Sequence, residues 1–240
     1  MQISPDVLFS VAGFPVTNTV ITTLITDVVI ITLVILATKK VSLKPQGTQN
    51  AIETIIDYFR ETTESIAGSR ASFIYPWVVS FFLFIIISNL IAQIPGFESI
   101  RFHVSSGDHG VPLLRAATSD LNLTLALAVA SVVTTHFLSI KHTGIKGYLT
   151  RFISFKMFPV FLFVGILEFV NELAKFISFS FRLFGNIFAG EKVMATMYGI
   201  CSFGLPLPFI GLELMVALIQ AIVFAMLTMA FMHIMTDKSH

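Results

Sequence analysis

Five apolar stretches constrain the fold of this chain more than any other feature. They cover residues 17–38, 73–94, 121–140, 157–199 and 206–235, and none contains a long polar interruption. About 20 apolar residues in an α-helix are enough to cross the hydrocarbon core of a bilayer. The sequence therefore predicts an all-α, polytopic integral membrane protein with five membrane-embedded helices.

The fourth stretch is too long for an upright span. A helix of about 40 residues is about 60 Å long, roughly twice the hydrocarbon thickness. We expect it to tilt steeply or to break. Proline at the start of the fifth stretch favours a new helix from about residue 206. We treat the chain as one membrane domain, 1–240, with parts 1–72, 73–156 and 157–240.

The composition excludes several classes of function. Hydrophobic residues make up 55% of the chain and charged residues 12%, and the net charge is +1. A chain so weakly charged gives no electrostatic reason to expect nucleic acid as a partner. The single cysteine, Cys201, excludes an internal disulfide and any paired-cysteine metal site. Because no phosphate-binding or hydrolase motif occurs either, we expect no cofactor and no bond chemistry in this chain.

The basic residues predict the orientation. If the N-terminus is outside, the inner segments 39–72, 141–156 and the tail carry ten Lys or Arg residues, against two in the outer segments. The positive-inside rule therefore favours an outer N-terminus and an inner C-terminus. The first stretch lacks a basic leader and is expected to be a retained span. The absence of a presequence and the inner Lys/Arg bias favour a bacterial cell membrane.

An amphipathic helix is predicted between the first two spans. Asn50 followed by Glu53 is a helix-start signature, and apolar residues then recur on one face. Such a helix is expected to lie on the inner membrane surface, although a simple connector is an equally good interpretation. The apolar face is predicted to contain Ile52, Ile55, Ile56, Phe59 and Ile66.

Ionisable residues inside the apolar stretches point to function. A charge at the bilayer centre costs about 2.5–3.5 kcal/mol on insertion scales, so such residues mark ion pathways by default. An alternative for Glu172 and Lys175 is a mutual ion pair that only stabilises packing. The acidic residues concerned are Asp27, Glu168, Glu172, Glu191 and Glu213.

Arg182 has no acidic residue three or four positions away on its own helix. It shares one helical stripe with Glu168, Glu172, Lys175 and Asn186, and small residues beside the stripe would let another helix approach. Guanidinium stays protonated at any accessible pH, so Arg182 can attract a carboxylate but cannot relay a proton. We therefore predict that Arg182 meets the carboxylate of a second protein.

Two groups of acids are predicted on opposite sides of Arg182. Glu168 lies about 21 Å along the helix to its inner side, and Glu191 about 13 Å to its outer side. On the antiparallel last helix, Glu213 falls near the outer end and Gln220 comes level with Arg182. This spacing predicts two access paths that do not join.

Several blocks of the sequence resemble one family. The stretch FRLFGNIFAGE at residues 181–191 is similar to the signature of subunit a of the F-type ATP synthase. Residues 82–97, 119–128, 144–148, 220–224 and 227–228 are similar to the family's other blocks, in the same order. The resemblance covers about residues 14–235.

This resemblance implies a function and a set of partners. It implies a stator subunit that lies against a rotating ring of c subunits, with b-type peripheral stalk subunits as neighbours and the F1 sector as an indirect partner. The last two helices would form a long tilted hairpin against that ring. The resemblance assigns Arg182 to the ring carboxylate, Glu168 to an inner half-channel, and Asn186 and Gln220 to the surroundings of the arginine. It assigns the outer half-channel to Glu191, Glu213, Asp120 and Asn122.

Some features depart from the family pattern or fit other functions. Ala117 stands where the family usually has proline, Phe176 replaces the proline of a basic-proline pair, and Asp27 is unexpected. His136 is interpreted as a packing or interfacial residue.

The main alternative function is a self-contained secondary transporter, which would show repeated halves. The sequence leaves open whether the ion is H⁺ or Na⁺.

Overall fold

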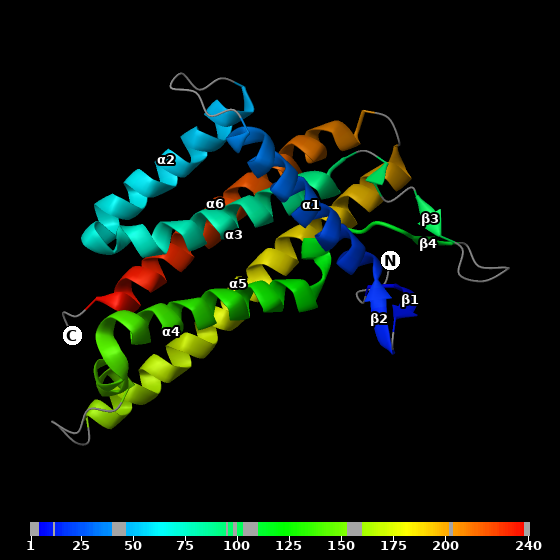
Figure 1. The fold of residues 1–240 in the computed structure, drawn as a ribbon. Helices are drawn as coiled ribbons and strands as arrows, with labels where there is room; N and C mark the ends of the chain where they lie inside the picture. The colour runs from blue at the N-terminus through cyan, green and yellow to red at the C-terminus, as the bar shows by residue number, and fades with distance from the viewer. Residues whose placement is uncertain are drawn as a thin grey trace.

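The computed structural model describes residues 5–11, 13–39, 47–94, 96–97, 100–102, 110–152, 160–201 and 204–237. Within these residues the fold is almost entirely helical (Figure 1). Two short antiparallel hairpins are formed by β1 (Val7–Val11) with β2 (Phe14–Thr17) and by β3 (Arg101–Phe102) with β4 (Val111–Pro112). The helices are α1 (Asn18–Thr38), α2 (Thr48–Ala67), α3 (Ala71–Ala92), α4 (Leu121–Phe152), α5 (Val160–Ile200) and α6 (Pro206–Thr236).

The polytopic helical class predicted from the sequence is confirmed. Among the described residues, four runs are long and apolar enough to cross a membrane: Asn18–Thr38, Gln49–Ala92, Leu121–Ile145 and Pro206–Thr236. The second run holds two helices, because the chain turns at Gly68–Arg70 between α2 and α3. α5 is not among the four, and it is the helix that carries charged side chains through its middle.

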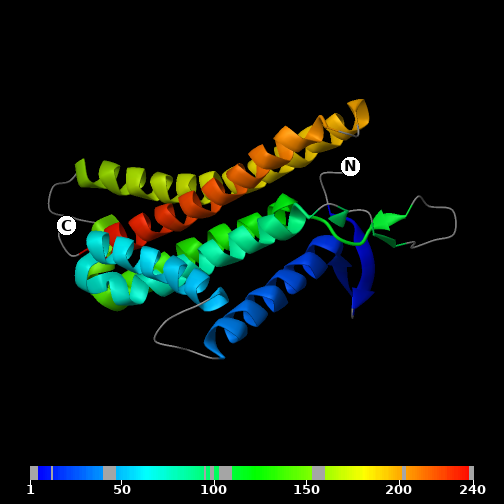
Figure 2. The ribbon, with the colours of Figure 1, turned by 90° about the horizontal axis from the view of Figure 1, so that it is seen from above.

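α5 does not break. It runs for 41 residues as one helix, so the sequence-based alternative of a broken element is wrong for residues 160–200. At about 1.5 Å per residue it is about 60 Å long. α5 and α6 lie side by side as a long hairpin, and this hairpin curves along its length (Figure 2). A helix of this length fits a bilayer only if it is strongly tilted.

α4 is longer than the predicted third span. It continues past residue 140 to Phe152, with a kink at Gly144, where φ is 80° and ψ is 158°. Glycine has no Cβ and adopts a positive φ at little cost. The stretch 144–148 therefore begins with a sharp kink and continues as a further helical segment. This segment turns towards the start of α5 (Figure 1).

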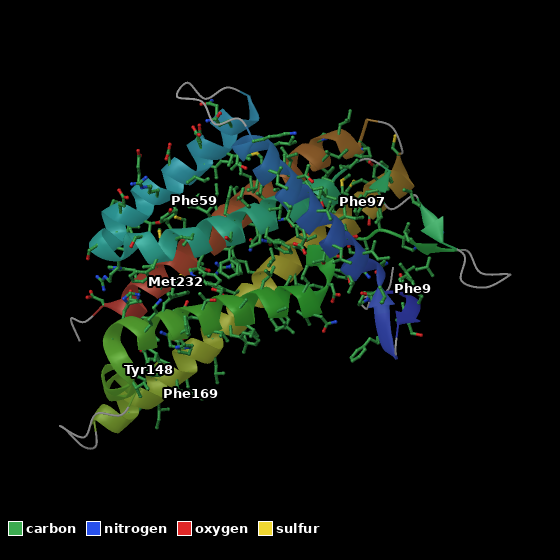
Figure 3. The ribbon with its side chains drawn as sticks, in the orientation of Figure 1. Phe9, Phe59, Phe97, Tyr148, Phe169 and Met232 are labelled. Carbon is green, nitrogen blue, oxygen red and sulfur yellow. The ribbon has the colours of Figure 1, made fainter. Side chains whose placement is uncertain are left out.

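The core is built around α3 and α6. Side chains of α3 such as Ile74 and Ile85 are fully buried, and so are Phe224 and Met232 of α6. Aromatic contacts link the helices further: the ring centroids of Phe179 on α5 and Phe224 are 4.9 Å apart. Figure 3 shows Met232 in the interior of the bundle. The hairpin is thus attached to the rest of the chain by the packing of α6 on α3 and of both its helices on α4.

The two ends of the bundle collect different segments. Both β hairpins, the end of α5 and the start of α6 lie at the end that holds the N-terminus, which we call the N-terminal end (Figures 1 and 2). At the opposite, C-terminal end, Arg70 Nη1 lies 3.2 Å from Asp237 Oδ1, and the rings of Phe73 and His142 stack at 3.7 Å. The α2–α3 corner, the last part of α4 and Asp237 at the end of α6 therefore meet at one end.

The amphipathic helix is present as α2, with two differences from the prediction. It begins at Thr48 after Gly47, so Asn50 lies inside its first turn and does not cap it. Phe59 is 1% exposed and packs on Phe82 of α3 at 4.8 Å between ring centroids (Figure 3). Ile66, predicted on the same face, is 44% exposed. The buried face is thus defined by packing on α3 and α6.

We expect Phe59→Ala to loosen α2 from the bundle. Removing a fully buried phenylalanine typically costs about 3–5 kcal/mol, because transfer energy is lost and a cavity remains. Thermal unfolding of the purified subunit in detergent should show a lower midpoint, and limited proteolysis should cut α2 faster. The matched control is Ile66→Ala on the same helix. An equal loss of stability in both variants would contradict the assignment of the buried face.

Candidate functional site

The centre of the α5–α6 hairpin is marked by a polar contact. Asn186 Nδ2 donates a hydrogen bond to Gln220 Oε1 at 2.7 Å. Gln220 is 3% exposed, although it lies in a largely apolar helix. The sequence predicted that Gln220 would come level with Arg182, and Asn186 lies one turn from Arg182 on α5. The antiparallel register of the hairpin is therefore as expected.

Arg182 lies on an open face of α5. Its side chain is exposed, and Nη2 donates to Ser178 Oγ at 3.3 Å. Among the described residues, no carboxylate forms an ion pair with it. The neighbouring side chains Ile177 and Phe181 are large, apolar and more than half exposed. A permanent cation thus stands on an apolar surface of this chain.

Glu191 and Glu213 lie between Arg182 and the N-terminal end of the bundle. The Glu213 carboxylate packs directly on Gly190, the residue before Glu191: a Cβ added at Gly190 would lie only 2.7 Å from Glu213 Oε1. Oxygen Oε1 of Glu191 is itself buried. The lack of a side chain at Gly190 thus makes room for the Glu213 carboxylate beside α5. Glu213, predicted to share the outer path with Glu191, thus lies beside the residue that precedes Glu191.

Asp120 has a clear structural function. Its Oδ1 accepts a hydrogen bond from the backbone N–H of Asn122 at 2.9 Å, which caps the start of α4. Its Oδ2 accepts from Thr19 Oγ1 of α1 at 2.8 Å. The Asn122 side chain is exposed. The nearby Thr124 shares a hydrogen bond with Ser180 of α5 at 3.3 Å. Asp120 therefore joins α1 to α4, close to a polar contact with α5.

A second charged group lies between Arg182 and the C-terminal end of the bundle. Lys175 Nζ lies 2.6 Å from Glu172 Oε1 and 4.4 Å from the ring centroid of Phe231 on α6. Glu172 Oε2 lies 3.6 Å from His136 Nε2 of α4. His136 Nδ1 is in turn 3.1 Å from Tyr148 Oη. Burial, and to a smaller extent the Glu172 charge, raise the pKa of Tyr148.

The residues of the predicted stripe on α5 lie in two environments. The side chains of Lys175 and Glu172 are about 10% and 12% exposed and are packed against α4 and α6. Glu168, one turn before Glu172, is half-buried. Arg182 and Asn186 lie where the face is open. Acids thus lie on either side of Arg182, as the spacing predicted, but the Glu172–Lys175 pair that was left open as an alternative is also present.

Several residues of this region were missed by sequence reasoning. His136 was interpreted as a packing residue, and Tyr148 was not singled out as a functional residue. The sequence did not indicate that Gly190 and Thr19 contact acidic side chains. Tyr148 reaches His136 only because the chain turns at Gly144, and a periodic pattern does not predict such a turn. Asp27 of α1 is half-buried and forms no hydrogen bond or ion pair with another described residue.

The chain is similar to one family along nearly its whole length. The family profile described as "ATP synthase A chain" matches residues 20–233. The chain belongs to the ATP synthase subunit a family. ATP synthase subunit a of Moorella thermoacetica is 32% identical over 230 residues, which is 96% of this chain and 95% of that protein. ATP synthase subunit a of Geobacter sp. (strain M21) is 32% identical over 234 residues, with 97% of this chain and 92% of that protein covered.

Subunit a of Syntrophobacter fumaroxidans adds a match that is 31% identical over 242 residues. These matches confirm the resemblance that was drawn from the 181–191 signature and the blocks around it. This subunit a is therefore a multi-pass membrane chain, and the prediction that it is a non-catalytic subunit follows from its family. Among the described residues, no group of three or more His, Cys, Asp or Glu side chains could hold a metal ion.

We expect Gly190→Ala to displace the Glu213 carboxylate. The added methyl would overlap Glu213 Oε1, so the carboxylate must move from α5. In membrane vesicles that contain the whole ATP synthase, ATP synthesis should fall at least about tenfold if the displaced acid carries protons. Gly199→Ala on the same helix is the control, because nothing lies within 4 Å of the added Cβ. Equal rates in both variants would show that this close packing has no function.

Proposed function

We propose that this subunit a is the non-catalytic, ion-translocating stator of the membrane sector of ATP synthase. It offers two offset half-channels to the carboxylates of a ring of c subunits, and Arg182 separates them. The observation that carries this proposal is the position of Arg182, exposed on an apolar face of α5 with acidic side chains on either side of it along the hairpin. The part that performs translocation is the α5–α6 hairpin within residues 157–240.

The proposed cycle follows from the cost of burying charge. An ion from the outside reaches a ring carboxylate past Glu191, Glu213 and the start of α4, and neutralises it. A neutral ring subunit can then face lipid, because the cost of an uncompensated charge is removed. After rotation, the ion leaves by the inner path near Glu168 and Glu172. The bare carboxylate then pairs with Arg182.

Arginine suits the barrier between the two paths. Guanidinium remains charged at any accessible pH, so it attracts the ring carboxylate without passing a proton across. Asn186 and Gln220 fill the space beside it with a hydrogen bond between neutral groups. Neither amide titrates, so no proton carrier lies level with the arginine in this part of the hairpin.

The proposed orientation puts the C-terminal end of the bundle inside. Support comes from the ten inner basic residues and from the meeting of the α2–α3 corner, the end of α4 and Asp237 at that end. We propose the bacterial cell membrane as the location, with b-type stalk subunits and, indirectly, the F1 sector as further partners. The surface of α1 and the open face of α5 leave room for lipid and for these chains.

A self-contained secondary transporter is the alternative function. Transporters of that kind are typically built from repeated halves around a midplane site, and no such repeat is visible in this sequence. Blue-native electrophoresis of solubilised membranes separates the two functions. A transporter would run alone or as a small oligomer, whereas a stator would run within a very large complex.

Arg182→Ala should abolish coupled ATP synthesis while the complex still assembles. Loss of its pairing leaves a ring carboxylate uncompensated at a cost of about 2.5–3.5 kcal/mol, which corresponds to about 100-fold in rate. Arg182→Lys should also fail, because a buried amine can lose its proton and open a leak. The measurement is gradient-driven ATP synthesis in vesicles, with the amount of assembled complex as control. Full synthesis by either variant would refute the proposed barrier.

Glu213→Gln should slow ion-driven synthesis and leave the catalytic head intact. The amide keeps the volume and the contact with Gly190 but cannot take up a proton. Synthesis should fall at least about tenfold, within the range usual for loss of a proton-transferring group. ATP hydrolysis by the detached head should not change. Wild-type synthesis in this variant would remove Glu213 from the pathway.

A further inference from the structure

Four side chains at the C-terminal end form a connected group that the 181–191 signature does not include. We call it the His136 cluster: His136 and Tyr148 from α4, and Glu172 and Lys175 from α5. Successive polar atoms are 3.1 Å, 3.6 Å and 2.6 Å apart from Tyr148 to His136, to Glu172 and to Lys175. The cluster lies on the side of Arg182 where the proposed inner path runs.

The contacts of the His136 ring indicate which of its two nitrogens carries the proton. An ionised carboxylate only accepts hydrogen bonds, and the Lys175 ammonium lies 2.6 Å from Glu172 Oε1. We therefore assign the proton of the neutral ring to Nε2, which faces Glu172 Oε2, and we leave Nδ1 as the acceptor of the Tyr148 hydroxyl. Nδ1 is thus the basic nitrogen of the ring, in contact with the Tyr148 hydroxyl, and the Glu172 carboxylate lies on the opposite side of the ring.

The fold builds this arrangement from two separate features. The positive φ of Gly144 turns the end of α4 back, so that Tyr148 reaches the ring of a residue twelve positions earlier. Figure 3 shows Tyr148 in the segment beyond this kink. On the other side, the Phe231 ring of α6 lies against the Lys175 ammonium. Lys175 is thereby held beside Glu172, and Glu172 beside His136.

We propose that His136 carries protons between the inner half-channel and the inner membrane surface. This inference rests on the proposed function and deepens it, because it names the ion at this end as a proton. A proton arriving along the path forms a bond to Nδ1 and converts the neutral ring to imidazolium, with Glu172 as its counter-ion. The Nδ1–H bond then breaks, the proton passes to water at the surface, and the neutral ring returns.

Tyr148 is a positioning residue in this scheme. Its hydroxyl can donate to neutral Nδ1 or, after rotation, accept from the protonated ring. It therefore holds the ring in both charge states without carrying charge itself. The remaining charged groups that face His136 are Glu172 and Lys175 of α5; among the described residues of α6, the cluster meets the Phe231 ring.

Sodium fits this cluster poorly. Hard cations bind oxygen ligands, usually several carboxylate, carbonyl or water oxygens together. The Glu172 carboxylate already has an ammonium at 2.6 Å, whose charge repels a metal cation. The next group along the path is an imidazole nitrogen. Each of these features favours a proton over Na⁺.

The test compares two histidines of α4 in membrane vesicles that contain the whole ATP synthase. His136→Ala should lower ATP-driven proton pumping at least about tenfold, the lower side of the range for loss of a general acid–base group. Added imidazole should restore part of the rate by replacing the missing proton carrier. His142→Ala is the control, since that ring stacks on Phe73 and takes no part in the cluster. It should stay within about twofold of the wild type and should not respond to imidazole.

A second variant separates proton transfer from packing. His136→Gln keeps much of the volume and can still donate to Glu172, but it cannot carry a proton. We expect it to pump as slowly as His136→Ala and to respond to imidazole too. Tyr148→Phe should lower the rate several-fold and shift its pH profile. Wild-type pumping by His136→Gln, or the absence of imidazole recovery in both His136 variants, would overturn the proposal.

Two further arms complete the experiment. Pumping by the wild type should be insensitive to Na⁺, and Na⁺-stimulated ATP hydrolysis or Na⁺ uptake that survives a protonophore would overturn the inference. Arg182→Ala is measured in the same assay. If Arg182→Ala is inactive while both His136 variants pump normally, only the inference about His136 fails. If Arg182→Ala also pumps normally, the proposed function fails with it.

Discussion

A permanent positive charge on an apolar helix face is the constraint on which the rest of this structure depends. Arg182 is exposed on α5, beside large exposed apolar side chains, and its one hydrogen bond within the described residues goes to Ser178. Guanidinium does not neutralise itself by losing a proton. The titratable side chains of the described hairpin therefore lie at a distance from Arg182 along the helices. Level with the arginine, the chain places the neutral amides Asn186 and Gln220.

The two ends of the hairpin handle charge in different ways. Towards the N-terminal end of the bundle, the Glu213 carboxylate lies against Gly190, the residue before Glu191, because glycine leaves it room beside α5. On the C-terminal side, the acid Glu172 is balanced by Lys175 and touches an imidazole. Two acids attract cations. An ion pair beside a histidine has no net charge to attract them, and the imidazole ring exchanges protons. The asymmetry suits a path that takes up protons at one end and releases them at the other.

Much of the fold could be predicted, because long apolar stretches determine helices with little ambiguity. The bounds of α1, α3 and α6 lie within about two residues of those predicted, and the register of Gln220 with Arg182 followed from helical spacing. α2 begins two residues before the predicted Asn50, and Ile66, expected on the apolar face, is exposed, because the buried face of α2 depends on packing against α3 and α6. The contact of Tyr148 with His136 depends on one glycine backbone angle, which no periodic pattern encodes.

The same stripe of α5 contains both the packed Lys175 and the open Arg182, and this difference has an energetic consequence. Lys175 has its counter-ion within the chain, so its burial is compensated. Arg182 has none among the described residues, and a lone charge facing hydrocarbon costs about 2.5–3.5 kcal/mol on insertion scales. A carboxylate on a neighbouring chain would offset that cost. Association with an acidic partner is therefore favoured by the same residue that would block the leak between the two paths, so holding the rotor and separating the half-channels would be one property of one side chain.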